Sequence, residues 1–255
     1  MVLQIDQFTC RSDNYCVLVH DPESDETAII DAPDEGPILA AVERTGWTPT
    51  HILTTHHHGD HVAANEALKA RYGLKIVGPR AEAAKIPGID ETVSGDDVFR
   101  VCGEDVRVID TPGHTAGHIV YFLTGSKVLF AGDTLFSLGC GRLFEGSAAD
   151  MYGSLTRLRA LPAETSVYCG HEYTKANADF ALSVDPENDA LKARAAEVAE
   201  LRAAERPTLP TTIAREIDTN PFLRWDDKAI RTHLGMADAD DVAVFAEIRK
   251  RKDRF

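Results

Sequence analysis

The feature that most constrains the fold is LTTHHHGDH at residues 53–61, where four histidines and one aspartate lie within six consecutive residues. A short β-branched strand is predicted over residues 50–55 and a helix start near Asp60. Side chains two apart in extended chain point the same way, so His56 and His58 share a direction and His57 faces away. Imidazole and carboxylate groups are preferred metal ligands. The stretch therefore predicts a metal-type site at the end of a strand, with a polar surface patch as the alternative if it stood alone.

Three more predicted strands deliver a donor-type residue at their C-terminal ends, where open α/β sheets present their sites. His114 follows VRVID, Asp133 follows KVLFAG, and His171 follows SVYCG. One tetrahedral zinc ion takes about four ligands, so a larger set suits two ions that share a carboxylate. The seven donors are His56, His58, Asp60, His61, His114, Asp133 and His171.

Strand and helix patterns alternate through the first two thirds of the chain. Strands over residues 14–21 and 27–32 flank the polar turn PESDE and predict a hairpin, and two helices are expected to stop at Gly46 and Gly73. Strand signal fades from about residue 173, where helices are expected over residues 188–205 and 240–255. We predict an α/β domain at residues 1–172 and a smaller all-helical domain at residues 173–255.

Composition narrows the class of protein. The 255 residues carry a formal net charge of −14, which argues against nucleic acid and anionic membranes as partners. The five cysteines are odd in number and form no Cys-x-x-Cys motif, as expected of reduced thiols. The N-terminus does not read as a signal peptide and no segment reaches transmembrane length. These features together predict a cytoplasmic protein.

The motifs THHHGDH, GHTAGH, GDTLF and GHEYT resemble the metallo-β-lactamase superfamily. Further segments, DNYCVLV, GCGRLFEG, TNPFLR and RKRKDRF, are similar to those of glyoxalase II, the hydroxyacylglutathione hydrolases. The resemblance implies an αββα sandwich followed by a helical C-terminal domain, in a monomer. It also implies that His56, His58 and His114 bind one metal ion, that Asp60, His61 and His171 bind another, and that Asp133 bridges both. We expect two divalent ions, zinc first, with iron or manganese as alternatives.

The resemblance implies hydrolysis of the thioester S-D-lactoylglutathione to D-lactate and glutathione. Two metal ions roughly 3.5–4 Å apart can supply hydroxide at neutral pH, which would attack the thioester carbonyl carbon. Asp60 and Asp133 are the residues expected to serve this catalysis. A thiolate leaves readily, so the chemistry requires no strong general acid.

Glutathione carries two carboxylates, and the C-terminal RKRKDRF offers five cations against one anion. Arg249 and Lys252 are three residues apart and would share a helix face, and the resemblance assigns them to the glycine carboxylate. The alternative is a solvated helix end that complements the helix dipole. Within GCGRLFEG and GHEYT, Arg142, Phe144 and Tyr173 match further substrate contacts. Phe144 stands where glyoxalase II often has tyrosine, so one substrate hydrogen bond is expected to be absent.

Other functions share this set of donors. A glutathione persulfide dioxygenase with a single iron is the nearest alternative, and the segments TNPFLR and RKRKDRF favour glyoxalase II over it. A β-lactamase, a lactonase, a tRNA-processing nuclease or a non-catalytic metal-binding protein fits less well. Metal content and thioester turnover separate these readings.

Overall fold

The computed structural model describes residues 3–255 and divides into two compact units. The first unit comprises the residues up to Asp110 together with Gly117–Gly132. The second unit comprises Thr111–Ala116 and Asp133–Phe255. Among the described residues, no helix combines the length and the apolar character that crossing a membrane requires.

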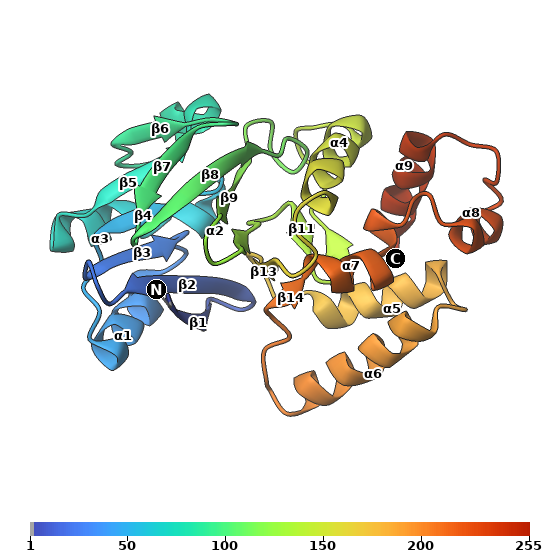
Figure 1. Ribbon diagram of the computed structural model, residues 1–255, viewed down its shortest axis with the longest axis horizontal. Coiled ribbons are helices and arrows are strands. Elements are labelled where there is room, and N and C mark those ends of the chain that lie inside the picture. The colour runs from blue at the N-terminus through green and yellow to red at the C-terminus, as the bar shows by residue number, and fades with distance from the viewer. Residues whose placement is uncertain (1–2) are drawn as a thin grey trace. The chain divides into compact units, whose positions relative to one another are not determined.

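The first unit contains a six-stranded mixed sheet with its strands in sequence order (Figure 1). Its first three strands pair antiparallel and the rest parallel. The predicted hairpin is confirmed, with Val17 opposite Ile30. The strands are β1 (Gln4–Cys10), β2 (Asn14–Asp21), β3 (Glu26–Ile30), β4 (His51–Leu53), β5 (Lys75–Pro79) and β6 (Glu91–Val93).

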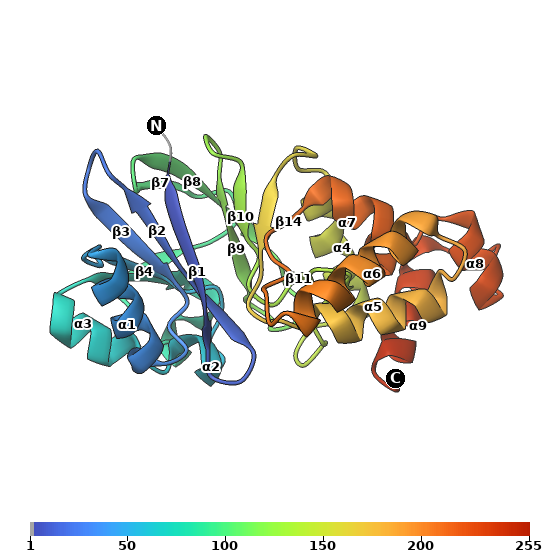
Figure 2. The ribbon, with the colours of Figure 1, turned by 90° about the horizontal axis from the view of Figure 1, so that it is seen from below.

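Helices α1 (Glu35–Thr45) and α3 (Asn65–Tyr72) lie side by side on one face of this sheet (Figure 2). Their buried residues Ile38 and Leu68 belong to the same apolar cluster as Leu18 and Ile52 of the strands. Both helices stop where predicted, because Gly46 and Gly73 adopt left-handed backbone with φ of 75° and 67°. A four-residue helix, α2 (Gly59–Val62), precedes α3.

A second group of strands in the first unit is antiparallel throughout. It consists of β7 (Val98–Val101), β8 (Glu104–Asp110), β9 (Ile119–Leu123) and β10 (Val128–Phe130). Strand β9 is buried along its whole length, which fits its continuous apolar sequence IVYFL. The 3-10 helix η1 (Arg80–Lys85) follows β5.

From Thr174 onward the elements are helices except for the two-residue strand at Thr211–Thr212, which agrees with the predicted helical C-terminal region, although the second unit itself also includes Thr111–Ala116 and begins again at Asp133. Helices α5 (Thr174–Val184) and α6 (Asp189–Ala203) run side by side in both views (Figures 1 and 2). The helix predicted over residues 188–205 is α6, and the one predicted over residues 240–255 is α9 (Asp241–Lys252). In chain order the elements are β11 (Leu135–Phe136), β12 (Gly139–Cys140), α4 (Ala148–Arg159), β13 (Ser166–Tyr168), α5 (Thr174–Val184), α6 (Asp189–Ala203), β14 (Thr211–Thr212), α7 (Ile213–Thr219), η2 (Pro221–Leu223), α8 (Lys228–Leu234) and α9 (Asp241–Lys252).

Candidate metal centre

The loop after β4 brings four predicted donors together within the first unit. The ring centroid of His56 lies 4.7 Å from that of His58 and 4.1 Å from that of His61. Ligand-type atoms of Asp60 and His61 lie within 4.8 Å of each other, with His61 Nε2 3.6 Å from Asp60 Oδ2. His56 and His61 are buried, while Asp60 is half-buried. Strand extension followed by one helical turn therefore clusters these side chains.

The carboxylate of Asp31 supports this donor set through hydrogen bonds to His61 and Thr55. Its Oδ2 lies 2.9 Å from His61 Nδ1 and accepts a 2.8 Å hydrogen bond from Thr55 Oγ1. Thr55 Oγ1 lies in turn 3.0 Å from His56 Nδ1. Because a carboxylate only accepts, the Nδ1 of His61 donates and its Nε2 is left to act as a ligand. Sequence reasoning missed Asp31, although it follows the strand in TAIIDA just as Asp133 follows KVLFAG.

Asn14 orients the half-buried carboxylate of this set. Its Nδ2 lies 3.1 Å from both the backbone oxygen and Oδ2 of Asp60. His118, which belongs to no predicted ligand position, stacks on His56 with ring centroids 4.8 Å apart. The ring of His57 turns to Glu82, 2.8 Å away, as expected from its alternate direction in the chain. These contacts fix the orientations of the Asp60 carboxylate and of the His56 and His57 rings.

The second unit holds the remaining three donors on three separate segments. His114 lies in the 111–116 segment, Asp133 follows β10, and His171 follows β13. All three side chains are buried. The Nε2 atoms of His114 and His171 lie 3.4 Å and 3.3 Å from the same atom, Asp133 Oδ2. One carboxylate oxygen is thus shared by two imidazoles.

These distances fit a metal site. Zinc bound by ligands at about 2.0–2.1 Å in a tetrahedron places neighbouring ligand atoms roughly 3.3–3.4 Å apart. The two separations that meet at Asp133 Oδ2 have this length, as expected if that oxygen belongs to two coordination shells. The donor chemistry, imidazole with carboxylate, also suits divalent first-row metals. The chain therefore carries donor groups that fit divalent metal binding.

Backbone packing aligns the donors of the second unit. His114 Nδ1 donates to the backbone oxygen of Arg142 at 2.9 Å, which leaves its Nε2 directed at Asp133. A Cβ on Gly141 would come within 1.9 Å of the Asp133 backbone oxygen, so this position accepts only glycine. Burial raises the pKa of Cys169 well above its ordinary value, and its thiol hydrogen bonds to the backbone oxygen of His171. A protonated, buried thiol acts here as a packing group.

Three predicted substrate residues lie beside these donors in the second unit. The Phe144 ring is 61% exposed, and its centroid lies 5.3 Å from that of His114. Arg142 places its guanidinium carbon 5.6 Å from the Phe144 centroid. Tyr173 stacks on His171, with ring centroids 4.8 Å apart and planes 3° from parallel. An accessible aromatic surface with one cation therefore adjoins the donor set.

The two predicted cations of α9 lie against aromatic rings. Arg249 is buried, donates to the backbone oxygen of Cys140 at 3.0 Å and to Asp253 Oδ1 at 2.8 Å, and lies over the Phe222 ring. Lys252 Nζ donates to the backbone oxygen of Ala176 at 2.9 Å. Burial lowers the pKa of Lys252. The side chain of Arg249 is thus used inside the unit, which its sequence position did not suggest.

Family models match nearly the whole chain. Residues 11–171 match the metallo-β-lactamase superfamily, and residues 172–255 match the C-terminus of hydroxyacylglutathione hydrolase. A protein of Mesorhizobium japonicum called hydroxyacylglutathione hydrolase is 66% identical over 255 residues, which is 100% of both chains. A protein of the same name from Brucella ovis is 64% identical, covering 99% of this chain and 98% of its own.

Solved structures share the fold. ETHE1 from Myxococcus xanthus superposes with a TM-score of 0.70 at 28% identity, covering 98% of this chain and 90% of its own. TTHA1623, solved in a di-iron-bound form, gives a TM-score of 0.63 at 26% identity and covers 86% of this chain and 100% of its own. The B3 metallo-β-lactamase BLEG-1, at 22% identity and a TM-score of 0.66, covers 86% of this chain and 99% of its own and supports the fold alone.

Proposed function

The chain belongs to the hydroxyacylglutathione hydrolases, the glyoxalase II family of the metallo-β-lactamase superfamily, and we propose from this that it cleaves S-D-lactoylglutathione to D-lactate and glutathione. The observation that carries the proposal is the 66% identity to a hydroxyacylglutathione hydrolase along the full length of both chains. The reaction is thioester hydrolysis, and it would remove a thioester that derives from methylglyoxal and glutathione. The single-iron persulfide dioxygenase is the alternative that the experiment below separates.

We propose that the seven donors together bind two divalent metal ions, with zinc as the first choice and iron or manganese as alternatives. His56, His58 and His114 would hold one ion, and Asp60, His61 and His171 the other, with Asp133 shared. The convergence of two imidazole nitrogens on Asp133 Oδ2 supports the shared role. The clustering of four donors in the loop after β4 supports the rest.

Metal ions bound there would acidify a coordinated water and polarise the thioester carbonyl. The protein's part is to keep the ligands in one geometry, so that no reorganisation is needed during the reaction. Asp133 and Asp60 would serve catalysis in this way, Asp133 held by its buried surroundings and Asp60 by Asn14. The leaving thiolate needs no proton from a strong acid.

Glutathione recognition is assigned to the second unit. We propose that Arg142, Phe144 and Tyr173 contact the tripeptide near the donors, and that Arg249 and Lys252 attract its glycine carboxylate. Residues 173–255 would form the helical domain that contributes this binding, after a catalytic domain at residues 1–172. The exposed Phe144 and half-exposed Tyr173 support contact with a ligand. Arg249 is buried and its charge is paired with Asp253, whereas Lys252 keeps two further N–H donors beyond its bond to Ala176, which makes Lys252 the stronger candidate for the carboxylate.

We further propose a cytoplasmic monomer that binds neither nucleic acid nor membranes. The net charge of −14 supports the exclusion of polyanionic partners. All five cysteines are free thiols, as a reducing compartment would maintain them.

The decisive experiment measures metal per chain together with two activities of the purified protein. Hydrolysis of S-D-lactoylglutathione with about two divalent ions per chain supports the proposal. Oxygen consumption with glutathione persulfide and a single iron supports the alternative. Metal binding without turnover of either substrate would contradict both.

Replacing Lys252 by alanine should raise the KM for lactoylglutathione roughly tenfold and leave kcat unchanged. A bond to a charged group is worth about 1.5–3 kcal/mol, and one made equally to substrate and transition state affects only KM. Steady-state kinetics against substrate concentration checks this. Lys250→Ala is the control, since Lys250 lies two residues away with its side chain 58% exposed. A fall in kcat at constant KM would contradict the recognition role.

A further inference from the structure

The buried carboxylate of Glu82, in η1, contacts the loop after β4 that carries the predicted ligands His56 and His58. Glu82 is 4% exposed. Its Oε2 accepts from the backbone N–H of His57 at 2.7 Å and lies 2.8 Å from His57 Nδ1. Because carboxylate oxygens only accept, the imidazole donates this second bond. Glu82 therefore binds both the backbone and the ring of His57, the residue between the predicted ligands His56 and His58.

The other oxygen of Glu82 grips a second loop of the same unit. Its Oε1 accepts from the backbone N–H of Gly117 at 3.0 Å. The approach is close, since a Cβ on Gly117 would lie 2.7 Å from Glu82 Cγ and 2.7 Å from Ala81 Cβ. The next residue, His118, stacks on His56 with ring centroids 4.8 Å apart. Both oxygens of one carboxylate thus act on the surroundings of His56, one through His57 and one through Gly117.

We propose that Glu82 is a positioning residue for the metal centre, one that sets the geometry of His56 and His58 without touching the metal. The proposal rests on the metal site of the proposed function. Oε2 fixes the peptide between the two ligands, and Oε1 fixes the loop whose imidazole backs His56. Residues that orient metal ligands from outside the coordination shell change metal affinity by about 10–100-fold when replaced.

Glu82→Gln should loosen this arrangement without a change in volume. The three hydrogen bonds that Glu82 accepts all come from N–H groups. A carboxamide offers one acceptor oxygen, and its NH₂ would face a donor at the other end. Either His57 or Gly117 must then lose its bond, and the loop that carries the ligands gains freedom. Cobalt(II) reports this directly, since its visible absorption depends on the number and geometry of the ligands.

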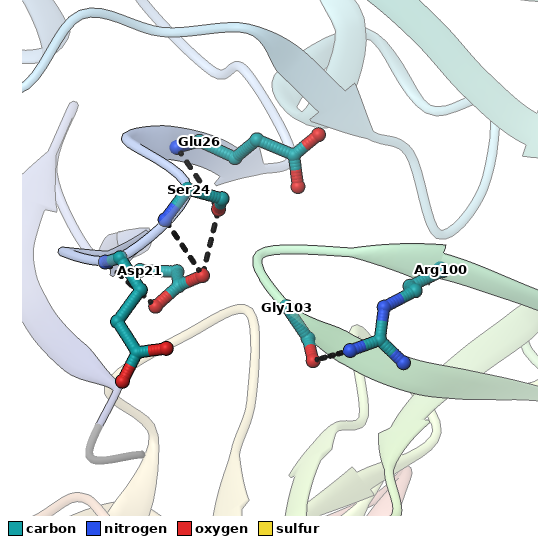
Figure 3. A pocket seen from close by; sticks show the side chains of 6 residues that line it. Asp21, Ser24, Glu26, Arg100 and Gly103 are labelled. Atoms are coloured by element: carbon teal, nitrogen blue, oxygen red, sulfur yellow. Dashed lines mark hydrogen bonds between the residues drawn. The ribbon is translucent and has the colours of Figure 1, made fainter.

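Asp21 provides a matched control in the same unit, and Figure 3 shows its carboxylate hydrogen-bonded to Ser24. It is a buried carboxylate that accepts from the backbone N–H groups of Glu23 and Ser24 at 3.1 Å and 3.2 Å, and from Ser24 Oγ at 2.7 Å. It therefore clamps a turn as Glu82 clamps a loop. Asp21 lies beside an open pocket lined by Glu23, Ser24, Glu26, Arg100 and Gly103, and none of the predicted ligands belongs to that turn.

The test titrates cobalt(II) into the metal-free full-length wild type, Glu82→Gln and Asp21→Asn, in competition with a chromophoric chelator. We expect Glu82→Gln to bind cobalt at least tenfold more weakly and with an altered visible spectrum. Asp21→Asn should keep the wild-type affinity within twofold and the wild-type spectrum. Thermal unfolding of the metal-free proteins should show both variants destabilised. A general loss of stability therefore cannot account for the difference in affinity.

Wild-type affinity and spectrum in Glu82→Gln would overturn the proposal, as would equal losses in both variants. If Glu82→Gln does not fold, Glu82→Asp replaces it, because aspartate keeps the charge but withdraws it by one methylene. Glu82→Asp should also bind cobalt about tenfold more weakly. Unchanged cobalt binding in this variant would overturn the proposal. A wild type that binds cobalt yet does not hydrolyse lactoylglutathione defeats the proposed function, and the affinity comparison still decides the role of Glu82.

Discussion

Asp133→Ala should abolish thioester hydrolysis and disturb metal binding throughout the centre. The single atom Asp133 Oδ2 lies within 3.4 Å of two imidazole nitrogens, those of His114 and His171. Removing it takes one ligand from each of the two proposed ions and leaves two buried imidazoles facing each other. We expect kcat to fall by about 100-fold or more, beyond what the loss of an outer supporting group produces. Metal analysis should show less than the wild-type content per chain.

Asp226→Ala is the control for this prediction. Asp226 lies in the same unit and pairs with Arg159 at 3.0 Å with half of its side chain exposed, and such pairs contribute about 0–1 kcal/mol. This variant should keep wild-type metal content and kcat. Full activity in Asp133→Ala with a normal metal content would refute the shared-ligand role.

Of the substitutions proposed for this protein, Glu216→Ala should lower the free energy of unfolding the most. This buried carboxylate accepts from the backbone N–H of Leu138 at 2.7 Å, Thr211 Oγ1 at 2.7 Å, Asn220 Nδ2 at 3.0 Å and Ser137 Oγ at 3.2 Å. Alanine would leave the Leu138 N–H and the Thr211 and Ser137 hydroxyls without this acceptor, at about 1–3 kcal/mol for each group that water cannot reach, while Asn220 Nδ2 keeps the backbone oxygens of Phe136 and Gly139. We expect the free energy of unfolding in urea to fall by at least about 3 kcal/mol.

Glu216→Gln separates the hydrogen bonds from the charge. Leu138 and Asn220 both donate to Oε2, so a glutamine oxygen can serve them, while the hydroxyls of Ser137 and Thr211 can turn to accept from its NH₂. This variant should lie within about 1 kcal/mol of wild type. A loss as large as that of the alanine variant would show that the negative charge, rather than hydrogen-bond satisfaction, stabilises the network.

The pH dependence of this pair has a definite sign. Burial raises the pKa of Glu216 above its ordinary value of 4.5. Between 4.5 and that higher value the folded state binds more protons than the unfolded state, so wild-type stability falls as the pH rises through this window. Glutamine has no such proton. The difference in unfolding free energy should therefore shift in favour of Glu216→Gln with rising pH.

Local patterns predicted the elements whose ends depend on local chemistry. The β2–β3 hairpin and the helix ends at Gly46 and Gly73 follow from turn residues and from left-handed backbone. Strand β1 was not predicted, because Gln4, Asp6 and Gln7 interrupt its apolar pattern and its pairing with β2 forms it. The single helix expected between residues 60 and 73 is interrupted, with α2 ending at Val62 and α3 starting at Asn65.

The donor residues were predictable because each follows an apolar strand or lies in a compact motif. Their supports were harder to find. Asp31 obeyed the same rule and was overlooked, while Glu82 lies in RAEAAK, a segment that looks like an exposed helix surface. Only tertiary packing makes Glu82 buried. Arg249 shows the same limit, since a basic tail predicts solvent exposure and the fold instead buries its guanidinium against Cys140 and Phe222.

The division into units has a consequence for dissecting the protein. The polypeptide passes from one unit to the other three times, after Asp110, Ala116 and Gly132. Neither unit is a contiguous stretch of chain, so no single proteolytic cut or truncation yields both intact. Fragment complementation or circular permutation would have to respect all three passages. A nick between Ala116 and Gly117, for example, would break the chain between His114 and His118. His114 would remain part of the second unit and His118 part of the first.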